Sequence, residues 1–174
     1  MFRRYGFIGI LLIIFVEANF FLKIQPFANW YFPIVWLGYI LVVDAIIYKL
    51  RRNSLISNRF QEFLGMAVIS ALLWWIFEFI NIIVGNWNYG TPGSSIDPAQ
   101  LAILANLMGT ISFATVLPAF FETVELVRSI HLFDNNKLDK HYKINKKFLH
   151  YMIGFGVVFF VLHLFLPLFA YPLV

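Results

Sequence analysis

Long apolar segments alternate with short polar ones along this chain, and the lengths of the apolar segments restrict its fold most. A helix needs roughly 20 apolar residues to cross the ~30 Å hydrocarbon core of a bilayer. Five segments are long enough, at residues 5–22, 30–48, 63–84, 99–121 and 148–170. Charged residues make up only 13% of the 174 residues, which is too few for the surface of a soluble domain. We therefore predict an all-α, polytopic transmembrane helix bundle with five spans, built as a single domain over residues 1–174.

The segments between the spans have loop composition. Residues 23–29 contain Pro26, residues 49–59 are basic, residues 85–98 are rich in Gly, Asn, Pro and Ser, and residues 122–147 are polar and basic. The sequence Asp97-Pro98-Ala99-Gln100 is a helix start signal, with a capping residue, proline at the first helical position and a capping-box glutamine. We expect the fourth span to start there.

The distribution of basic residues predicts the orientation. In a five-span arrangement, twelve of the thirteen Lys and Arg residues lie on the side of the N-terminus, and Lys23 is the exception. The positive-inside rule then places the N-terminus and the loops 49–59 and 122–147 in the cytoplasm and the C-terminus outside. We predict a multi-pass protein of the inner (cytoplasmic) membrane. Because the basic residues lie in short loops, they indicate membrane lipids as partners and not nucleic acid.

Both ends of the sequence allow a second interpretation. Arg3 and Arg4 before an apolar run that ends near Glu17 resemble a secretory signal, but the run continues through Leu22, so we expect a retained helix. Residues 166–174 repeat the proline and aromatic pattern of residues 26–35. This is either the start of a second, parallel repeat, which would make the chain a piece of a longer protein, or a chance similarity.

Acidic residues inside the spans are the first candidates for function. An ionised carboxylate at the bilayer centre costs about 2.5 to 3.5 kcal/mol on insertion scales. At a rise of about 1.5 Å per residue, Glu17 and Glu78 lie roughly 6 to 8 Å outward from the centres of their helices. We predict a polar pocket in the outer half of the bundle. Its candidate catalytic residues are Glu78 and Asn81, and its candidate substrate-binding residues are Glu17, Trp74, Trp75, Trp87, Asn106 and His163.

Each of these residues also has a structural interpretation. Buried Asn and Glu side chains hydrogen-bond membrane helices to each other, at about 0.6 kcal/mol per contact. Trp87 belongs to the uncharged segment 86–93, which suits an interfacial aromatic belt as well as a lid over Glu78. Both interpretations remain open at this point.

The acidic residues of the inner half have simpler explanations. Asp44 is two helical turns from Arg51, which can extend back toward it, so we expect a structural pair. Glu122 and Glu125 border the basic loop and are expected to be ordinary charges at a helix end. Pro118, just before them, frees a backbone carbonyl, as at kinks in membrane helices.

The sequence lacks the motifs of several enzyme classes. It has no cysteine, so it offers no disulfide, thiolate nucleophile or cysteine-based metal site. It has no GxSxG, phosphate-binding glycine loop, HExxH or ExxH motif. His131, His141 and His150 lie in or beside the basic loop and are expected at the surface. We predict no metal site, and the cofactor is unknown.

Two resemblances follow from these segments. The run 74–81, together with 86–89 and 113–123, resembles a family of uncharacterised bacterial multi-pass membrane proteins built as tandem repeats. This chain would correspond to the first half, and the resemblance implies no activity. Phe77-Glu78 is similar to the aromatic–Glu motif of integral-membrane isoprenoid cyclases of the lycopene and meroterpenoid type, which implies that Glu78 protonates an alkene or epoxide.

Three functions are consistent with the sequence. In the first, protonated Glu78 is the general acid in the modification of an isoprenoid or lipid, and Trp faces stabilise the developing cation. In the second, the chain is a non-catalytic subunit that binds pigment, quinone or lipid, or that helps a larger membrane complex or homo-oligomer to assemble. In the third, it is a small transporter or proton pathway, with Glu17, Glu78 and Asp44 as steps. The sequence does not choose among them.

Overall fold

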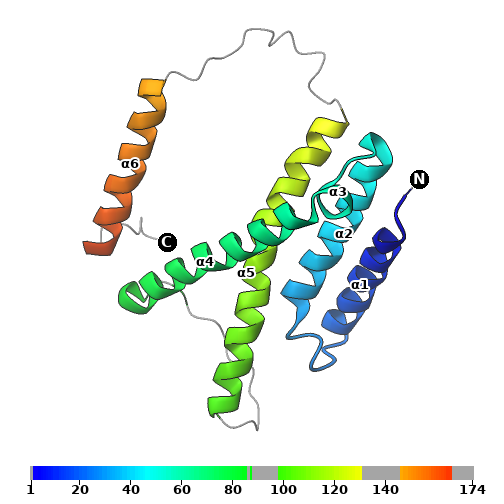
Figure 1. The fold of residues 1–174 in the computed structure, drawn as a ribbon. Coiled ribbons are helices and arrows are strands. Elements are labelled where there is room, and N and C mark those ends of the chain that lie inside the picture. Colours follow the sequence, from blue (N-terminus) through cyan, green and yellow to red (C-terminus); the bar gives the residue numbers. More distant parts are fainter. Residues whose placement is uncertain (1, 86, 88–97, 131–145, 166–174) are drawn as a thin grey trace. The chain divides into compact units, whose positions relative to one another are not determined.

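A computed structural model describes residues 2–85, 87, 98–130 and 146–165, with the side chains of 98–102, 160 and 163–165 excepted. Every regular element in these residues is a helix, which confirms the all-α fold class. The helices are α1 (Arg4–Phe21), α2 (Tyr31–Arg51), α3 (Leu55–Asn58), α4 (Phe60–Val84), α5 (Pro98–Ser129) and α6 (Lys146–Phe165) (Figure 1).

Four helices of the described chain are long and apolar enough to cross a membrane. They are α1, α2, α4 and the part of α5 from Ile103 to Ser129. Helix α6 overlaps the fifth expected segment, 148–170, over residues 148–165, and residues 166–170 lie outside the described chain. The chain is therefore a candidate multi-pass membrane protein, while the fifth span and the orientation remain predictions.

Several helix boundaries differ from those expected. Helix α2 continues to Arg51 and α4 begins at Phe60, so both extend toward or into the basic segment 49–59, which also contains the short helix α3. Helix α5 continues past residue 121 to Ser129. No glycine or proline follows Pro118 in α5, so nothing in residues 119–129 ends the helix. Helix α5 begins at Pro98, as the start signal predicts, while the expected cap Asp97 lies outside the described residues. The extension of α5 puts Glu122 and Glu125 inside a helix.

The chain forms two compact units, each of which we describe separately. The first comprises Met1–Ile76 and Tyr89–Phe133, and the second comprises Phe77–Asn88 and Asp134–Val174. In the first unit, α2 packs against α1, α3 and α5 (Figure 1). Helix α4 belongs to the first unit up to Ile76, and its last residues belong to the second.

Helices α1 and α2 approach closely at two glycines. A Cβ added to Gly9 would lie 2.6 Å from the carbonyl oxygen of Gly38, and one added to Gly38 would lie 2.9 Å from that of Gly9. Small residues at such crossings let membrane helices pack backbone to backbone. The buried apolar side chains of the two helices are Val16, Ile40, Val43, Ala45 and Ile47.

Helix α4 crosses α5 through an inserted serine hydroxyl. Ser70 is 1% exposed, and its Oγ donates to the carbonyl oxygen of Phe113 at 2.5 Å and accepts the amide N–H of Leu117 at 3.0 Å. Residues 113 and 117 are one α-helical turn apart, so the hydroxyl bridges a donor and an acceptor that an uninterrupted helix joins directly. Pro118 follows and has no N–H, so the hydrogen-bond ladder of α5 is interrupted at this crossing.

Candidate functional site

The structure brings three residues of the predicted outer pocket together in the second unit. The Asn81 side chain donates to the carbonyl oxygen of Trp87 at 2.9 Å and accepts the Trp87 backbone N–H at 3.0 Å. The Trp87 indole N–H lies 3.3 Å from Glu78 Oε1. Asn81 therefore fixes Trp87 beside the Glu78 carboxylate. This arrangement is compatible with the lid interpretation as well as with the aromatic belt.

Other members of that pocket have local partners in the first unit. Glu17 is exposed and accepts the Tyr31 hydroxyl at 2.7 Å. Asn106 is exposed on α5, and its carbonyl oxygen accepts the Thr110 hydroxyl at 2.8 Å. The side chain of His163 lies outside the described residues. The convergence of these residues with Glu78 is a prediction that the two separately described units leave untested.

Trp74 and Trp75 contact α5. Both rings lie 5.8 Å from the ring of Phe113, centroid to centroid, and the Trp75 indole N–H donates to Thr110 Oγ1 at 3.1 Å. The two tryptophans are 36% and 37% exposed. They pack α4 onto α5 and leave about a third of each side chain accessible for a substrate or lipid.

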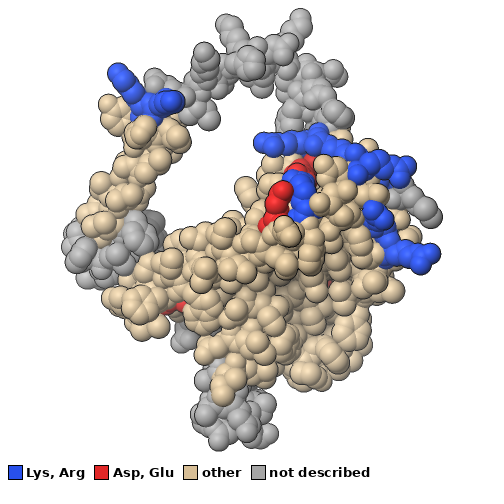
Figure 2. Space-filling view, viewed as in Figure 1, with Lys and Arg blue, Asp and Glu red and all other residues tan. Residues whose placement is uncertain are grey.

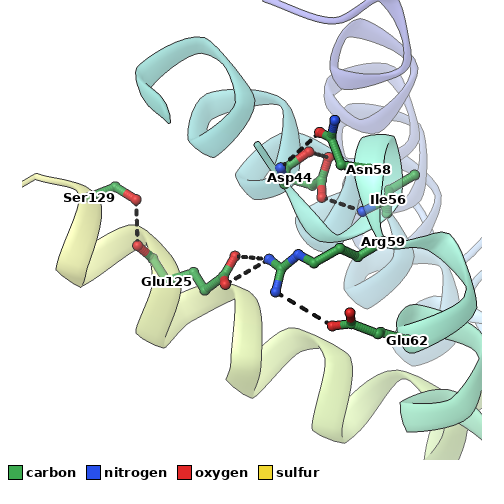
Figure 3. A network of polar contacts seen from close by, with 8 residues as sticks. Asp44, Ile56, Asn58, Arg59, Glu62, Glu125 and Ser129 are labelled. Atoms are coloured by element: carbon green, nitrogen blue, oxygen red, sulfur yellow. Dashed lines mark hydrogen bonds and ion pairs between the residues drawn. The ribbon is translucent and has the colours of Figure 1, made fainter. Parts of the chain in front are cut away.

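A second polar cluster lies in the first unit, around Asp44 in the C-terminal half of α2. This residue is completely buried, and its carboxylate accepts three hydrogen bonds: from the Tyr5 hydroxyl, from Ser54 Oγ at 2.9 Å and from the Ile56 amide at 2.7 Å. Figure 3 shows the contact between Asp44 and Ile56. The expected pairing with Arg51 is wrong, because the partners come from α1, from the residue before α3 and from α3. Arg51 is exposed at the end of α2.

A hydroxyl chain leads from the surface to Asp44. Tyr5 lies 2.8 Å from Ser57 Oγ, and its own proton is donated to Asp44, so Ser57 is the donor to Tyr5. Tyr5 and Ser57 both line a surface groove. The turn before α3 is fixed by Asn58, whose Oδ1 accepts the backbone N–H of Ser54 at 3.1 Å. Hydrogen bonds thus connect Ser57 at the groove, through the Tyr5 hydroxyl, to the buried carboxylate of Asp44.

Glu122 of α5 is the most unusual member of this cluster. It is completely buried, and neither carboxyl oxygen has a hydrogen-bond partner in the described part of the chain. It lies within electrostatic reach of Asp44. The expectation of an ordinary charge at a helix end is wrong, because α5 continues beyond Glu122 and its side chain is completely buried. An ionised carboxylate without hydrogen bonds is very unfavourable in such a place, so these surroundings favour the protonated side chain.

Glu125 lies one turn further along α5 and, unlike Glu122, is paired with a positively charged side chain. Both of its oxygens accept from the same guanidinium nitrogen of Arg59, at 2.7 Å each, and a second nitrogen lies 3.5 Å from Glu62 (Figure 3). The hydrogen bond to Glu125 raises the pKa of Arg59 above its ordinary value, while partial burial opposes the rise. This ion pair ties the segment before α4 to α5 and places a positive charge near Glu122.

These groups define the chemistry available at the cluster around Asp44 and Glu122. No three side chains of metal-binding type converge among the residues that the structure describes. The cluster instead combines a hydrogen-bonded carboxylate, an unpartnered carboxyl group and hydroxyls that both donate and accept. Such groups can hold and transfer a proton.

Comparisons with known proteins add no relative to this picture. No protein-family model, curated protein or solved structure matches the chain, so the resemblances inferred from its motifs remain predictions.

Proposed function

We propose that this chain is a proton-conducting or proton-coupled membrane protein, with five spans and a cytoplasmic N-terminus, in which Glu122 is the central proton-binding residue. The supporting observation is the complete burial of Glu122 without a hydrogen-bond partner beside the fully hydrogen-bonded Asp44. Ionisable residues inside membrane spans are rare, and they mark proton and ion pathways in transporters and pumps.

The two carboxyl groups differ in a way that suits proton exchange. Three donors stabilise the ionised form of Asp44, and no donor stabilises the ionised form of Glu122. Two like charges in one low-dielectric site repel each other strongly. The pair of carboxyl groups is therefore more stable with one proton bound than with both groups ionised. The proton resides on Glu122, and Asp44 is the neighbouring group that can deliver or receive it.

The hydroxyl chain supplies the route from the cytoplasmic side. Each hydroxyl can accept one proton while it donates another, so a proton that enters at Ser57 displaces one from Tyr5 onto Asp44. This route replaces the one expected from the sequence, in which Glu17, Glu78 and Asp44 were the steps. Glu17 and Glu78 have their own partners, Tyr31 and Trp87.

Proton flux into liposomes tests the proposal. The full-length chain is reconstituted with a pH-sensitive dye inside the vesicles, and a potassium gradient with valinomycin drives proton entry. Glu122→Gln keeps the shape of the side chain but removes its titration, and we expect it to abolish the flux. Glu62→Gln is the matched control, because the Glu62 side chain is 60% exposed and should be dispensable. Equal flux through wild type and Glu122→Gln, or no flux through wild type, would refute the proposal.

Acid catalysis at Glu78 is a second candidate, favoured by one contact. The Trp87 indole N–H lies 3.3 Å from Glu78 Oε1, so an aromatic ring that can stabilise a substrate cation is next to a potential proton donor. Conversion of a supplied polyene by the wild-type protein, lost in Glu78→Gln and kept in Glu62→Gln, is the expected result. Unchanged product formation by folded Glu78→Gln would exclude this function.

A further inference from the structure

An arginine-lined groove opens where α1 begins and α2 ends. Its volume is about 700 Å³, and its lining includes Arg3, Arg4, Tyr5, Tyr48, Arg52 and Ser57. Figure 2 shows blue basic side chains gathered at this end of the first unit. The volume lies in the range of small-molecule sites, about 300 to 1,000 Å³. The groove is therefore large enough for a phosphate group together with the group attached to it.

The charges of the groove are not neutralised by the protein. No aspartate or glutamate lines it, and Arg3, Arg4 and Arg52 form no ion pair within the described residues. Arg59, by contrast, is paired with two glutamates. Three exposed guanidinium groups around one groove produce a positive potential that favours an anion.

Two of the arginines are held in place by contacts on α2. The Arg3 guanidinium lies 3.8 Å from the centroid of the Tyr48 ring, in a cation–π contact. Arg52 has a φ of 60°, in the left-handed region, and its backbone N–H closes the helix on the carbonyl oxygen of Tyr48 at 2.9 Å. Glycine is the usual residue for such a conformation. Replacing Arg52 by glycine should thus remove the side chain while preserving the backbone.

The position of the groove identifies the anion. Because it lies at the ends of two apolar helices, it is level with the lipid headgroups of a surrounding bilayer. The ring of Phe2, which also lines the groove, contacts Phe7 at 5.0 Å between centroids. Phe7 and Leu11, one turn apart, are 59% and 65% exposed and continue the apolar surface along α1. A groove that carries three arginines next to an apolar strip matches a molecule with an anionic head and an acyl chain.

We propose that this groove binds the phosphate headgroup of an anionic phospholipid, with Arg3, Arg4 and Arg52 around the phosphate and the acyl chain along Phe7 and Leu11. Arginine is well suited to this role because its planar guanidinium forms paired hydrogen bonds with phosphate oxygens. This binding does not require proton transfer, so its test is independent of the function proposed for Glu122.

Native mass spectrometry of the full-length protein in a neutral detergent measures the binding. The protein is titrated with phosphatidylglycerol, with phosphatidylcholine and, in competition, with inorganic phosphate. We expect tighter binding of phosphatidylglycerol than of phosphatidylcholine and no displacement by equimolar inorganic phosphate. Each basic residue near an anionic lipid surface contributes about fivefold in affinity, so Arg52→Gly should weaken phosphatidylglycerol binding by about that factor.

Two further measurements keep the test specific. Arg51→Gln removes an exposed neighbouring arginine that does not line the groove, and it should bind phosphatidylglycerol like the wild type. Thermal unfolding should show Arg52→Gly to be at least as stable as the wild type. Equal binding of the two lipids, wild-type affinity in Arg52→Gly or an equal loss in Arg51→Gln would overturn the site. Displacement of the lipid by equimolar phosphate would assign the groove to free phosphate instead.

Discussion

Truncation of Asp44 is the sharpest test of how the cluster around Asp44 and Glu122 holds the first unit together. The carboxylate is completely buried and accepts hydrogen bonds from Tyr5, Ser54 and Ile56, which lie 39, 10 and 12 residues away in the sequence. In Asp44→Ala, the buried Ser54 hydroxyl and the Ile56 amide lose their acceptor. Tyr5 keeps its contact with Ser57. The variant thus removes the group that joins α1 and α3 to α2.

The expected loss follows from these contacts. A hydrogen bond to a charged acceptor contributes about 1.5 to 3 kcal/mol, and two of the three are lost without replacement, so Asp44→Ala should lower the free energy of unfolding by about 3 to 6 kcal/mol. Asp44→Asn should lower it by only about 1 kcal/mol. Its amide oxygen can still accept the Ile56 N–H, and its NH₂ can face the hydroxyls of Tyr5 and Ser54, which can rotate to accept.

The assay is unfolding of the purified protein in mixed micelles with increasing SDS, followed by circular dichroism. Glu62→Ala is the control for the loss of a carboxylate, because the Glu62 side chain is 60% exposed and its ion pair with Arg59 is long, at 3.5 Å. A loss below about 1 kcal/mol for Asp44→Ala, or equal losses for Asp44→Ala and Asp44→Asn, would refute the assigned hydrogen bonds.

Three other substitutions test separate contacts by the same unfolding assay. Gly38→Ala should destabilise the protein by about 1 to 3 kcal/mol, because the added Cβ would meet the backbone of α1. Gly65→Ala is the control, because nothing lies within 4 Å of its added Cβ, and it should not destabilise. Equal effects of the two substitutions would contradict the close crossing. Ser70→Ala should destabilise the protein by about 0.6 to 1.7 kcal/mol, the range of interhelical hydrogen bonds in membranes. Ser112→Ala should destabilise it less, because the Ser112 hydroxyl forms a hydrogen bond within its own helix. The reverse order would argue against the bridge. Arg59→Lys keeps the charge but loses the planar guanidinium, so it should destabilise by about 1 kcal/mol, and a neutral result would show that charge alone is sufficient.

The helices were predictable because they depend on length and apolarity. The predicted segment 5–22 corresponds to α1 (Arg4–Phe21), and the proline of the start signal is the first residue of α5. The end of α5 was not predicted, because a hydrophobic span was assumed to stop at its first charge, Glu122. Helix formation continues as long as no glycine, proline or competing cap interrupts it. In this chain the apolar segment and the helix have different ends.

The cluster around Asp44 and Glu122 was not predicted from the sequence, because its contacts are made between helices. Tyr5 and Asp44 are 39 residues apart, on either side of the turn between α1 and α2, and a single sequence does not tell which helix faces meet. One signal was present: Tyr5 lies in the first turn of α1 and Asp44 about two turns before the end of α2, so the two residues have similar depth in an antiparallel pair. Arg51 was the closer cation in sequence, but a buried carboxylate is satisfied by hydrogen-bond donors as well as by charge.

The lipid groove and the proton route share Tyr5 and Ser57, and this overlap predicts that anionic lipid accelerates proton entry. The unpaired arginines repel a proton that approaches Ser57, and a bound phosphate would neutralise part of that charge. In dye-loaded liposomes, we expect faster flux with phosphatidylglycerol than with phosphatidylcholine. Arg52→Gly should reduce this dependence on lipid, since it weakens lipid binding, while Arg51→Gln should retain it. Lipid dependence that persists unchanged in Arg52→Gly would mean that the general surface charge of the bilayer, and not the groove, controls proton entry.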